Sequence, residues 1–255
     1  MVRGFIDPDK HECYQAVIHV GRGPAATLPQ AGDSWEWTGV HWFDASLDEV
    51  PDTPRCFVAL AVLESMDYPS LARVPGALHK LKACGTLLGA VAVAGAEQAA
   101  ALYRLWQDHN ATLVGPTQDE RAVPMIVSVE DRADVRDVLR WCNMFTYAPM
   151  MVCADWFDIR AIGSQGHPVR HHRIIADDYR TALDMFGRQS QQAGPVVMTS
   201  LVESASCMRL ESISEIGEVV DRHNGSEPVI TMITCILAEH DDSTTELHWL
   251  ELLSD

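Results

Sequence analysis

The sequence predicts an α/β fold whose first half is a mostly parallel β-sheet. Short apolar runs, typical of buried strands, alternate with segments of helical periodicity. Such alternation is typical of parallel strands joined by right-handed helical crossovers. The predicted strands of this half are 16–20, 39–43, 55–63, 87–94 and 111–114, and the predicted helices are 71–83 and 97–109. In the second helix, Ala101, Leu102 and Leu105 share the face that we expect to be buried.

The composition is that of a globular chain large enough to bury a core. The chain has 255 residues, of which 47% are hydrophobic, and a formal net charge of −17. This charge argues against nucleic acid and anionic lipid as partners. The seven cysteines form no CxxC pair, no apolar run reaches the roughly 18 residues of a membrane span, and the start of the chain has no signal-peptide core. We therefore expect a cytoplasmic protein with reduced thiols and no direct membrane anchor.

Two loops follow predicted strands of the first half. Gly21 and Gly23 come directly after the strand 16–20, where small residues let backbone N–H groups approach a phosphate. An ordinary turn remains the alternative. The loop at 64–70, ESMDYPS, is unsuited to phosphate, because its side chains are bulky and Pro69 has no N–H to donate. Its carboxylates would also repel phosphate oxygens, by about 1–4 kcal/mol for a contact at about 4 Å.

The stretch 131–160 predicts a helix, a short strand and an acidic loop. Four apolar residues recur at helical spacing on one face: Val135, Val138, Leu139 and Cys142. Ser128 is predicted to cap the start of this helix, and Pro149 to end it. The apolar run 150–154 predicts a strand, and Asp155 and Asp158 lie in the loop that follows. A solvated turn or a helix N-terminus is the alternative interpretation of these two aspartates.

The stretch 170–173 reads RHHR and predicts a solvated basic patch. A metal site is not expected, because adjacent histidines do not share a helix face and no carboxylate follows at i+3 or i+4.

The remaining chain predicts a helix, a strand, a helix and two strands, at 177–189, 195–201, 212–223, 228–237 and 245–253. Ser212 and Glu215 fit a capping box, and Asn224-Gly225 fits a helix stop. We expect a small α+β unit.

Three segments resemble the FtsZ/tubulin superfamily. Residues 137–140, DVLR, are similar to the family's helix motif, DVL followed by Arg or Lys. Residues 149–160, PMMVCADWFDIR, are similar to PGLxNxDFADVR, with Cys153 in place of asparagine, and the last sixty residues resemble the FtsZ C-terminal domain. The chain departs from the family at 64–70, where FtsZ has the phosphate loop GMGGGTGTG, and its central helix is about one turn shorter. We identify a divergent, truncated FtsZ-like chain.

This resemblance implies a tubulin/FtsZ-like fold: a mostly parallel Rossmann-like sheet in residues 1–130, a central helix at 131–148, and a smaller α+β domain at 149–255. It also implies the roles of the site residues. Asp155 and Asp158 would be catalytic, orienting the water that attacks GTP held by an adjoining subunit. Asp137 would face the guanine, and Gly21 and Gly23 would be what is left of the phosphate cradle. GTP or GDP is the implied ligand, and Mg²⁺ is implied only where a nucleotide binds.

The function predicted from this combination is that of a cytoskeletal or filament-associated protein with degenerate nucleotide binding. It would act as a self-assembling scaffold, or as a modulator of an FtsZ/tubulin-like partner filament, through its acidic loop. Cell division, plasmid maintenance and membrane remodelling are processes open to such a filament.

Two alternatives stay open. One is an active GTP-hydrolysing polymer protein with an atypical phosphate loop. The other is an unrelated doubly wound enzyme for a small anionic substrate, which a pocket lined by His19, His41 or His109 would favour.

Overall fold

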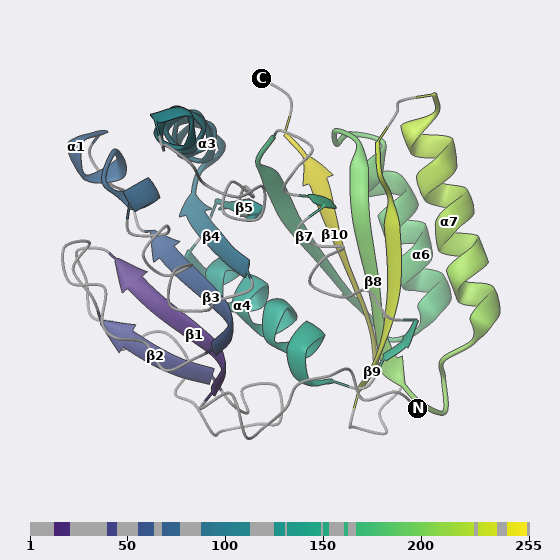
Figure 1. Ribbon diagram of the computed structural model, residues 1–255. Helices are drawn as coiled ribbons and strands as arrows, with labels where there is room; N and C mark the ends of the chain where they lie inside the picture. Colours follow the sequence, from purple (N-terminus) through teal and green to yellow (C-terminus); the bar gives the residue numbers. More distant parts are fainter. Residues whose placement is uncertain are drawn as a thin grey trace.

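The computed structural model describes residues 13–20, 40–44, 56–63, 68–76, 88–112, 125–130, 132–148, 150–152, 161–162, 167–226, 229–238 and 244–253. The strands among them form one ten-stranded sheet in the order β2-β1-β3-β4-β5-β7-β10-β8-β9-β6. Helices pack against both faces of this sheet (Figure 1).

The first half of the sheet is parallel, as the alternation of strands and helices predicts. It consists of β1 (Cys13–Val20), β2 (Val40–Asp44), β3 (Cys56–Leu63), β4 (Leu88–Ala94) and β5 (Met125–Val129). Each of these strands pairs in parallel with its neighbour. The chain places β2 on one side of β1 and β3 on the other, so the topological switch point lies between β1 and β3.

Two helices of this half differ from their predicted bounds. Helix α1 covers Tyr68–Leu71, a turn at 72–73 interrupts the predicted helix 71–83, and 74–76 are helical again. The rest of that predicted helix lies outside the described residues. Helix α3 covers Ala96–Thr112 and includes 111–112, which the sequence predicts as the start of a strand. Its buried residues are Ala99, Leu102, Tyr103 and Trp106, so the predicted face is correct only at Leu102. No helix in the described ranges is long and apolar enough to cross a membrane.

Ser128 does not cap the central helix. It lies inside β5, where every residue is buried, and its side chain is fully enclosed. A parallel strand covered on both faces has a near-continuous apolar sequence, and MIVSV fits that pattern better than a helix cap.

The central helix α4 (Arg132–Tyr147) and the short strand β6 (Met150–Val152) confirm the prediction for this stretch. The predicted apolar face is buried, with Val135, Val138, Leu139 and Cys142 each at most 4% exposed. Helix α4 contacts β1, β3, β4 and β5. The same helix shares a core cluster with residues of β8, β9 and β10, so it packs against both halves of the sheet.

The second half of the sheet is mixed. It consists of β7 (Val169–Ala176), β8 (Val196–Ser204), β9 (Met232–Ala238), β10 (Thr245–Leu252) and the edge strand β6. Strand β10 is antiparallel to both β7 and β8, and β8 is parallel to β9. A short parallel pairing of β5 with β7 joins the two halves.

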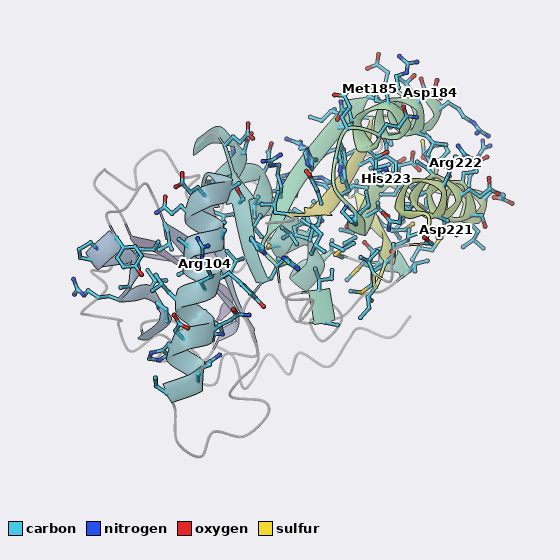
Figure 2. The ribbon with its side chains drawn as sticks, turned by 90° about the horizontal axis from the view of Figure 1, so that it is seen from above. Arg104, Asp184, Met185, Asp221, Arg222 and His223 are labelled. Atoms are coloured by element: carbon cyan, nitrogen blue, oxygen red, sulfur yellow. The ribbon has the colours of Figure 1, made fainter. Side chains whose placement is uncertain are left out.

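Helices α6 (Tyr179–Ser190) and α7 (Leu210–Asn224) cover the face of this half that is opposite to α4. Figure 2 shows the two helices side by side, with Asp184 on one and Asp221 on the other, away from Arg104 on α3. Asp178 caps α6 by accepting from the Thr181 N–H. The predicted capping box of α7 is wrong: Arg209 holds the N-cap position, and Ser212 is buried inside the helix.

Gly225 ends α7 as predicted, with φ +60°. Gly187 lies inside α6 and provides a comparison for a substitution at Gly225. We expect Gly225→Ala to destabilise the protein by about 1–3 kcal/mol, because a Cβ disfavours that backbone conformation. We expect Gly187→Ala to stabilise it by about 0.5–1 kcal/mol, since the nearest atom to an added Cβ is 4.0 Å away and glycine is a poor helix former. Guanidinium denaturation measures both changes. Equal stability of Gly225→Ala and wild type would contradict the first expectation.

Candidate functional site

The carboxyl ends of the parallel strands form one level edge. Val20 of β1 lies beside Leu63 of β3, Leu63 beside Val93 of β4, and Val93 beside Ser128 of β5. Ligands of open α/β sheets bind outside this edge at the switch point. Gly21 follows β1 directly at the switch point, but Gly21 and Gly23 lie outside the described residues. Their predicted role as a phosphate cradle stays a prediction.

The acidic loop leaves the sheet at a distant strand. Asp155 and Asp158 follow β6 and also lie outside the described residues, so their catalytic role stays a prediction. Strand β1 is the second strand of the sheet and β6 is the tenth. With neighbouring strands about 4.8 Å apart, β1 and β6 are roughly 40 Å from each other along the sheet. The two strands from which the predicted site loops depart are therefore far apart within one molecule.

Asp137 is the one predicted site residue that the structure describes. It lies on α4, and its Oδ1 accepts a hydrogen bond of 2.7 Å from Nη1 of Arg173 on β7. A carboxylate that recognises guanine must accept from the base's own N–H donors. A guanidinium already donates to one oxygen of Asp137, so a guanine would have to share this carboxylate with Arg173. The predicted role of Asp137 stays a prediction.

Asp137 is one end of an ion-pair network that centres on Glu246 of β10. Arg140 of α4 donates to both oxygens of Glu246, at 2.7 and 2.9 Å. Arg173 donates to Oε2 of Glu246 from Nε and Nη2, at 3.1 and 2.9 Å. Burial alone would raise the pKa of Glu246, but the hydrogen bonds from His248 and Arg140 and the charge of Arg140 hold that pKa well below its usual range. The network ties α4 to β7 and β10 through a permanently ionised carboxylate.

A pair of buried histidines continues the network. Nε2 of His171 on β7 lies 3.0 Å from Nδ1 of His248 on β10, and the two side chains are 8% and 0% exposed. Nε2 of His248 lies 3.3 Å from Oε2 of Glu246. Burial lowers the pKa of both histidines, and the neighbouring charges of Arg173 and, at His248, Arg140 lower it further, although Glu246 opposes this at His248. Both rings are therefore neutral near pH 7.

Helix α4 also makes uncharged polar contacts with this sheet. The indole Nε1–H of Trp141 donates to the Ser200 hydroxyl at 3.0 Å, and Thr234 donates to the same hydroxyl at 3.0 Å. The Trp141 ring lies against His171, with ring centroids 5.5 Å apart. Helix α4 thus meets the second half of the sheet through polar groups as well as through the apolar cluster that it shares with β8, β9 and β10.

The prediction of a solvated basic patch at 170–173 is wrong. These residues belong to β7, in the interior of the sheet, and they alternate between its faces. His171 and Arg173 point toward α4, whereas Arg170 and His172 contact Glu251 on the other face. The sequence does contain a signal for this arrangement: residues 246–251, ELHWLE, place two glutamates and a histidine among apolar residues. Such a strand can pair with a strand that carries arginines and histidines, because opposite charges on neighbouring strands attract.

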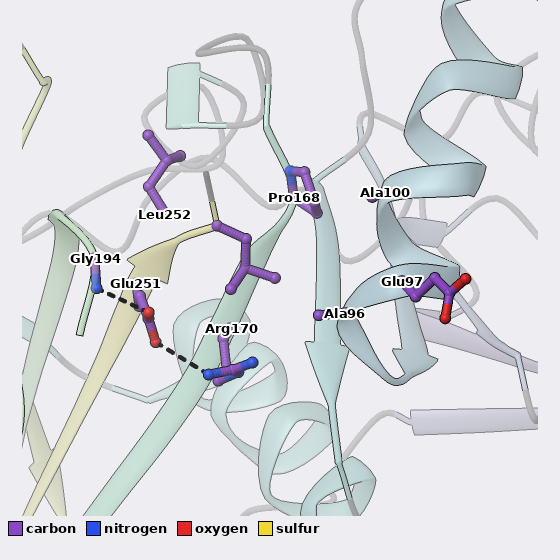
Figure 3. A pocket seen from close by; sticks show the side chains of 9 residues that line it. Ala96, Glu97, Ala100, Pro168, Arg170, Gly194, Glu251 and Leu252 are labelled. Atoms are coloured by element: carbon purple, nitrogen blue, oxygen red, sulfur yellow. Dashed lines mark hydrogen bonds and ion pairs between the residues drawn. The ribbon is translucent and has the colours of Figure 1, made fainter. Parts of the chain in front are cut away.

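The other face of β7 borders a cleft of about 490 Å³ between α3 and the end of β10 (Figure 3). Arg170, Glu251 and Gly194 lie on one wall, and the first turn of α3 forms the other. Glu251 accepts from the Gly194 N–H at 2.8 Å and lies 2.7 Å from Nε2 of His172. Burial alone would raise the pKa of Glu251, but its contacts with His172, Gly194 and Arg170 lower it. Figure 3 shows the Glu97 carboxylate directed away from Arg170.

His109 is not among the described residues that line this cleft. The side chains of His19 and His41 lie outside the described residues, so the enzyme alternative stays a prediction. In the part of the chain that the structure describes, no three His, Cys, Asp or Glu side chains are grouped as metal ligands would be.

Sequence comparisons give no match to a family model or to a curated protein. The fold does match solved structures. A mutant of FtsZ from M. jannaschii aligns over 77% of this chain and 65% of its own, with a TM-score of 0.52 and 10% identity. CetZ2 from Haloferax volcanii, in a protofilament with GTPγS bound, aligns over 78% of this chain and 66% of its own, with a TM-score of 0.50 and 10% identity. The chain spans just under two thirds of the length of either structure.

The matched region includes most of both halves of this chain. Its parallel sheet, its central helix and its mixed second sheet are the parts that the sequence resemblance predicts. At this level of identity the agreement concerns the fold. The chain therefore has the FtsZ/tubulin fold, in a form that has diverged far from FtsZ and CetZ2 in sequence.

Proposed function

We propose that this chain is an FtsZ-like filament protein. It assembles with itself or with an FtsZ/tubulin-like partner through the acidic loop that contains Asp155 and Asp158, and its own nucleotide site is degenerate. The similarity to FtsZ and to a CetZ2 protofilament supports the filament role. Residues 1–130, 131–148 and 149–255 would form its sheet domain, central helix and second domain.

The separation of β1 from β6 is the observation that carries this proposal. In the sequence the acidic loop follows β6 and the two glycines follow β1, and these two strands are roughly 40 Å apart along the sheet. We infer that the two segments do not act on one ligand within a molecule. A head-to-tail neighbour brings the acidic loop of one subunit to the carboxyl edge of the next, which is the arrangement that a filament repeats.

The Asp137–Arg173 ion pair supports weak or absent nucleotide binding. A guanine at Asp137 would share the carboxylate with Arg173, which already holds Oδ1 in a charge-assisted hydrogen bond of 2.7 Å. The loop at 64–70 adds carboxylates and a proline where the resemblance implies glycines. A filament of such subunits would be held by protein contacts alone. If the subunit joined the end of a GTP-bearing filament, it would offer no bound nucleotide to the next subunit, and the filament would stop growing at that end.

Assembly of the purified chain tests the proposal. We expect sedimenting polymers whose critical concentration changes less than about twofold between no nucleotide, GDP and GTP. The double variant Asp155→Lys, Asp158→Lys should raise the critical concentration at least tenfold, because it reverses the charge of the contact. Asp184→Lys, on the exposed face of α6, is the matched control and should assemble like wild type.

Two outcomes would change the proposal. If the double variant assembled as well as wild type, the acidic loop would not be part of the contact between subunits. If the wild type bound a fluorescent GTP analogue saturably and Asp137→Ala did not, the proposal of a degenerate site would be wrong. The alternative of an active GTPase would then be favoured.

A further inference from the structure

The His171–His248 pair lies at the junction between α4 and the second half of the sheet. Trp141 of α4 covers the His171 ring on one side, and His248 follows at 3.0 Å. Glu246 then connects His248 to Arg140 of α4. The hydrogen bond between the two rings joins β7 to β10, and α4 meets the pair through the Trp141 ring and through Arg140, which donates directly to Glu246.

One arrangement of protons satisfies all of these contacts. If His171 carries its proton on Nε2, it donates to the bare Nδ1 of His248. His248 then carries its own proton on Nε2 and donates to Glu246. Both rings are neutral in this arrangement. If both rings gain a proton, the two nitrogens that are 3.0 Å apart each carry a hydrogen, and the bond between them is lost.

We propose that the His171–His248 pair is a proton-sensitive latch beneath α4: the helix covers the pair while both rings are neutral, and it opens from the second half of the sheet when both rings become protonated. The latch is independent of the proposed filament function. It rests on the contacts between the two rings, Trp141 and Glu246.

The surroundings of the pair oppose protonation. The charged groups that face it are Arg140 and Asp137 from α4, Arg173 from β7 and Glu246 from β10, and His172 acts on His171 from the other face of β7. Glu246 raises the pKa of His248 through its hydrogen bond and its charge, but burial outweighs this effect, and Arg173 and Arg140 lower the pKa further. Burial of the rings lowers the pKa of His171 well below 6.5 and also lowers that of His248.

The sign of the pH effect follows from these lowered pKa values. Unfolded histidine has a pKa of about 6.5, so below that pH the unfolded chain binds protons that the folded pair does not. The folded state is therefore fully favoured above about pH 6.5 and loses stability as the pH falls below it. Two protons taken up on opening raise the opening equilibrium constant by up to about 100-fold per pH unit.

Nuclear magnetic resonance of ring-labelled histidine in the native chain tests the pair directly. We expect both rings to show the neutral, Nε2-protonated form at pH 6, where a free histidine is mostly charged. Titration of either ring with a midpoint near 6.5 in the folded protein would overturn the proposal.

Hydrogen exchange distinguishes a local latch from general acid instability. Between pH 7 and 5, after correction for the intrinsic exchange rate, protection in α4 should fall at least tenfold. Protection in α7, which packs on the opposite face of the sheet, should change much less. An equal fall in α4 and α7, or none in α4, would contradict the latch.

The double variant His171→Gln, His248→Gln supplies the matched comparison. Glutamine can donate and accept a hydrogen bond but does not titrate in this range. The variant should lose the pH dependence of α4 protection, whereas His172→Gln, on the other face of β7, should keep it. If the double variant does not fold, the histidine titration of the wild type still decides the question. A double variant that folds and keeps the pH dependence of wild type would refute the role of the pair.

Discussion

Glu246→Ala is expected to destabilise the protein by about 3 kcal/mol, because it removes the carboxylate that two half-buried guanidiniums share. Arg140 and Arg173 both donate to Glu246, and the Arg140 side chain is only 11% exposed. Breaking a buried pair costs far more than the pair contributes, since the remaining charge keeps its desolvation penalty. Guanidinium denaturation at pH 7 measures the loss.

The control for this variant is an exposed ion pair. Asp184 lies 4.0 Å from Arg188 on α6, and both side chains are about 80% exposed. Asp184→Ala should change stability by less than about 1 kcal/mol, because water screens such pairs. A similar small loss in both variants would show that the Glu246 network is solvated and does not hold α4.

Trp249→Ala is expected to destabilise the protein by a comparable amount, about 3–5 kcal/mol. Trp249 is 1% exposed in the middle of β10. Its ring stacks on His172 with centroids 4.6 Å apart and an interplanar angle of 8°, and it lies 5.2 Å from the Phe186 ring of α6. Removing it opens a large cavity between the sheet and α6 that neighbouring side chains cannot fill.

Trp249→Phe is the informative comparison. Among the described residues the Trp249 indole N–H has no hydrogen-bond partner, so phenylalanine removes a buried donor while keeping an aromatic ring. We expect a loss of less than about 1.5 kcal/mol by thermal or guanidinium unfolding. If Trp249→Phe costs as much as Trp249→Ala, the indole N–H has a partner, such as a buried water, and contributes more than its ring packing does.

The parts predicted well from the sequence are those whose pattern is local. The central helix was predictable because Val135, Val138, Leu139 and Cys142 repeat at 3.6-residue spacing, and all four are buried. The strands β1, β3 and β4 were predictable because a strand covered on both faces is apolar along its length. The stop at Gly225 was predictable because few residues other than glycine adopt its backbone conformation.

The errors lie where a neighbour that is distant in sequence decides the outcome. Ser128 has the composition of a helix cap, but pairing with β4 and β7 makes it part of a strand. For the candidate site, Asp137 is described in an ion pair with Arg173, while Gly21, Gly23, Asp155 and Asp158 and the domain boundaries stay predictions.

The sequence by itself determined most of the succession of strands and helices, because apolar periodicity is a property of each segment alone. The FtsZ/tubulin fold was implied by the resemblance at 137–140 and 149–160, and the solved structures confirm it. Only the tertiary structure decided the role of 170–173. From the sequence these four residues are predicted to form a hydrophilic surface patch. In the structure, β10 places Glu246, His248 and Glu251 beside them. Burying charged side chains is unfavourable unless partners satisfy them, and here the partners lie about seventy residues further along the chain.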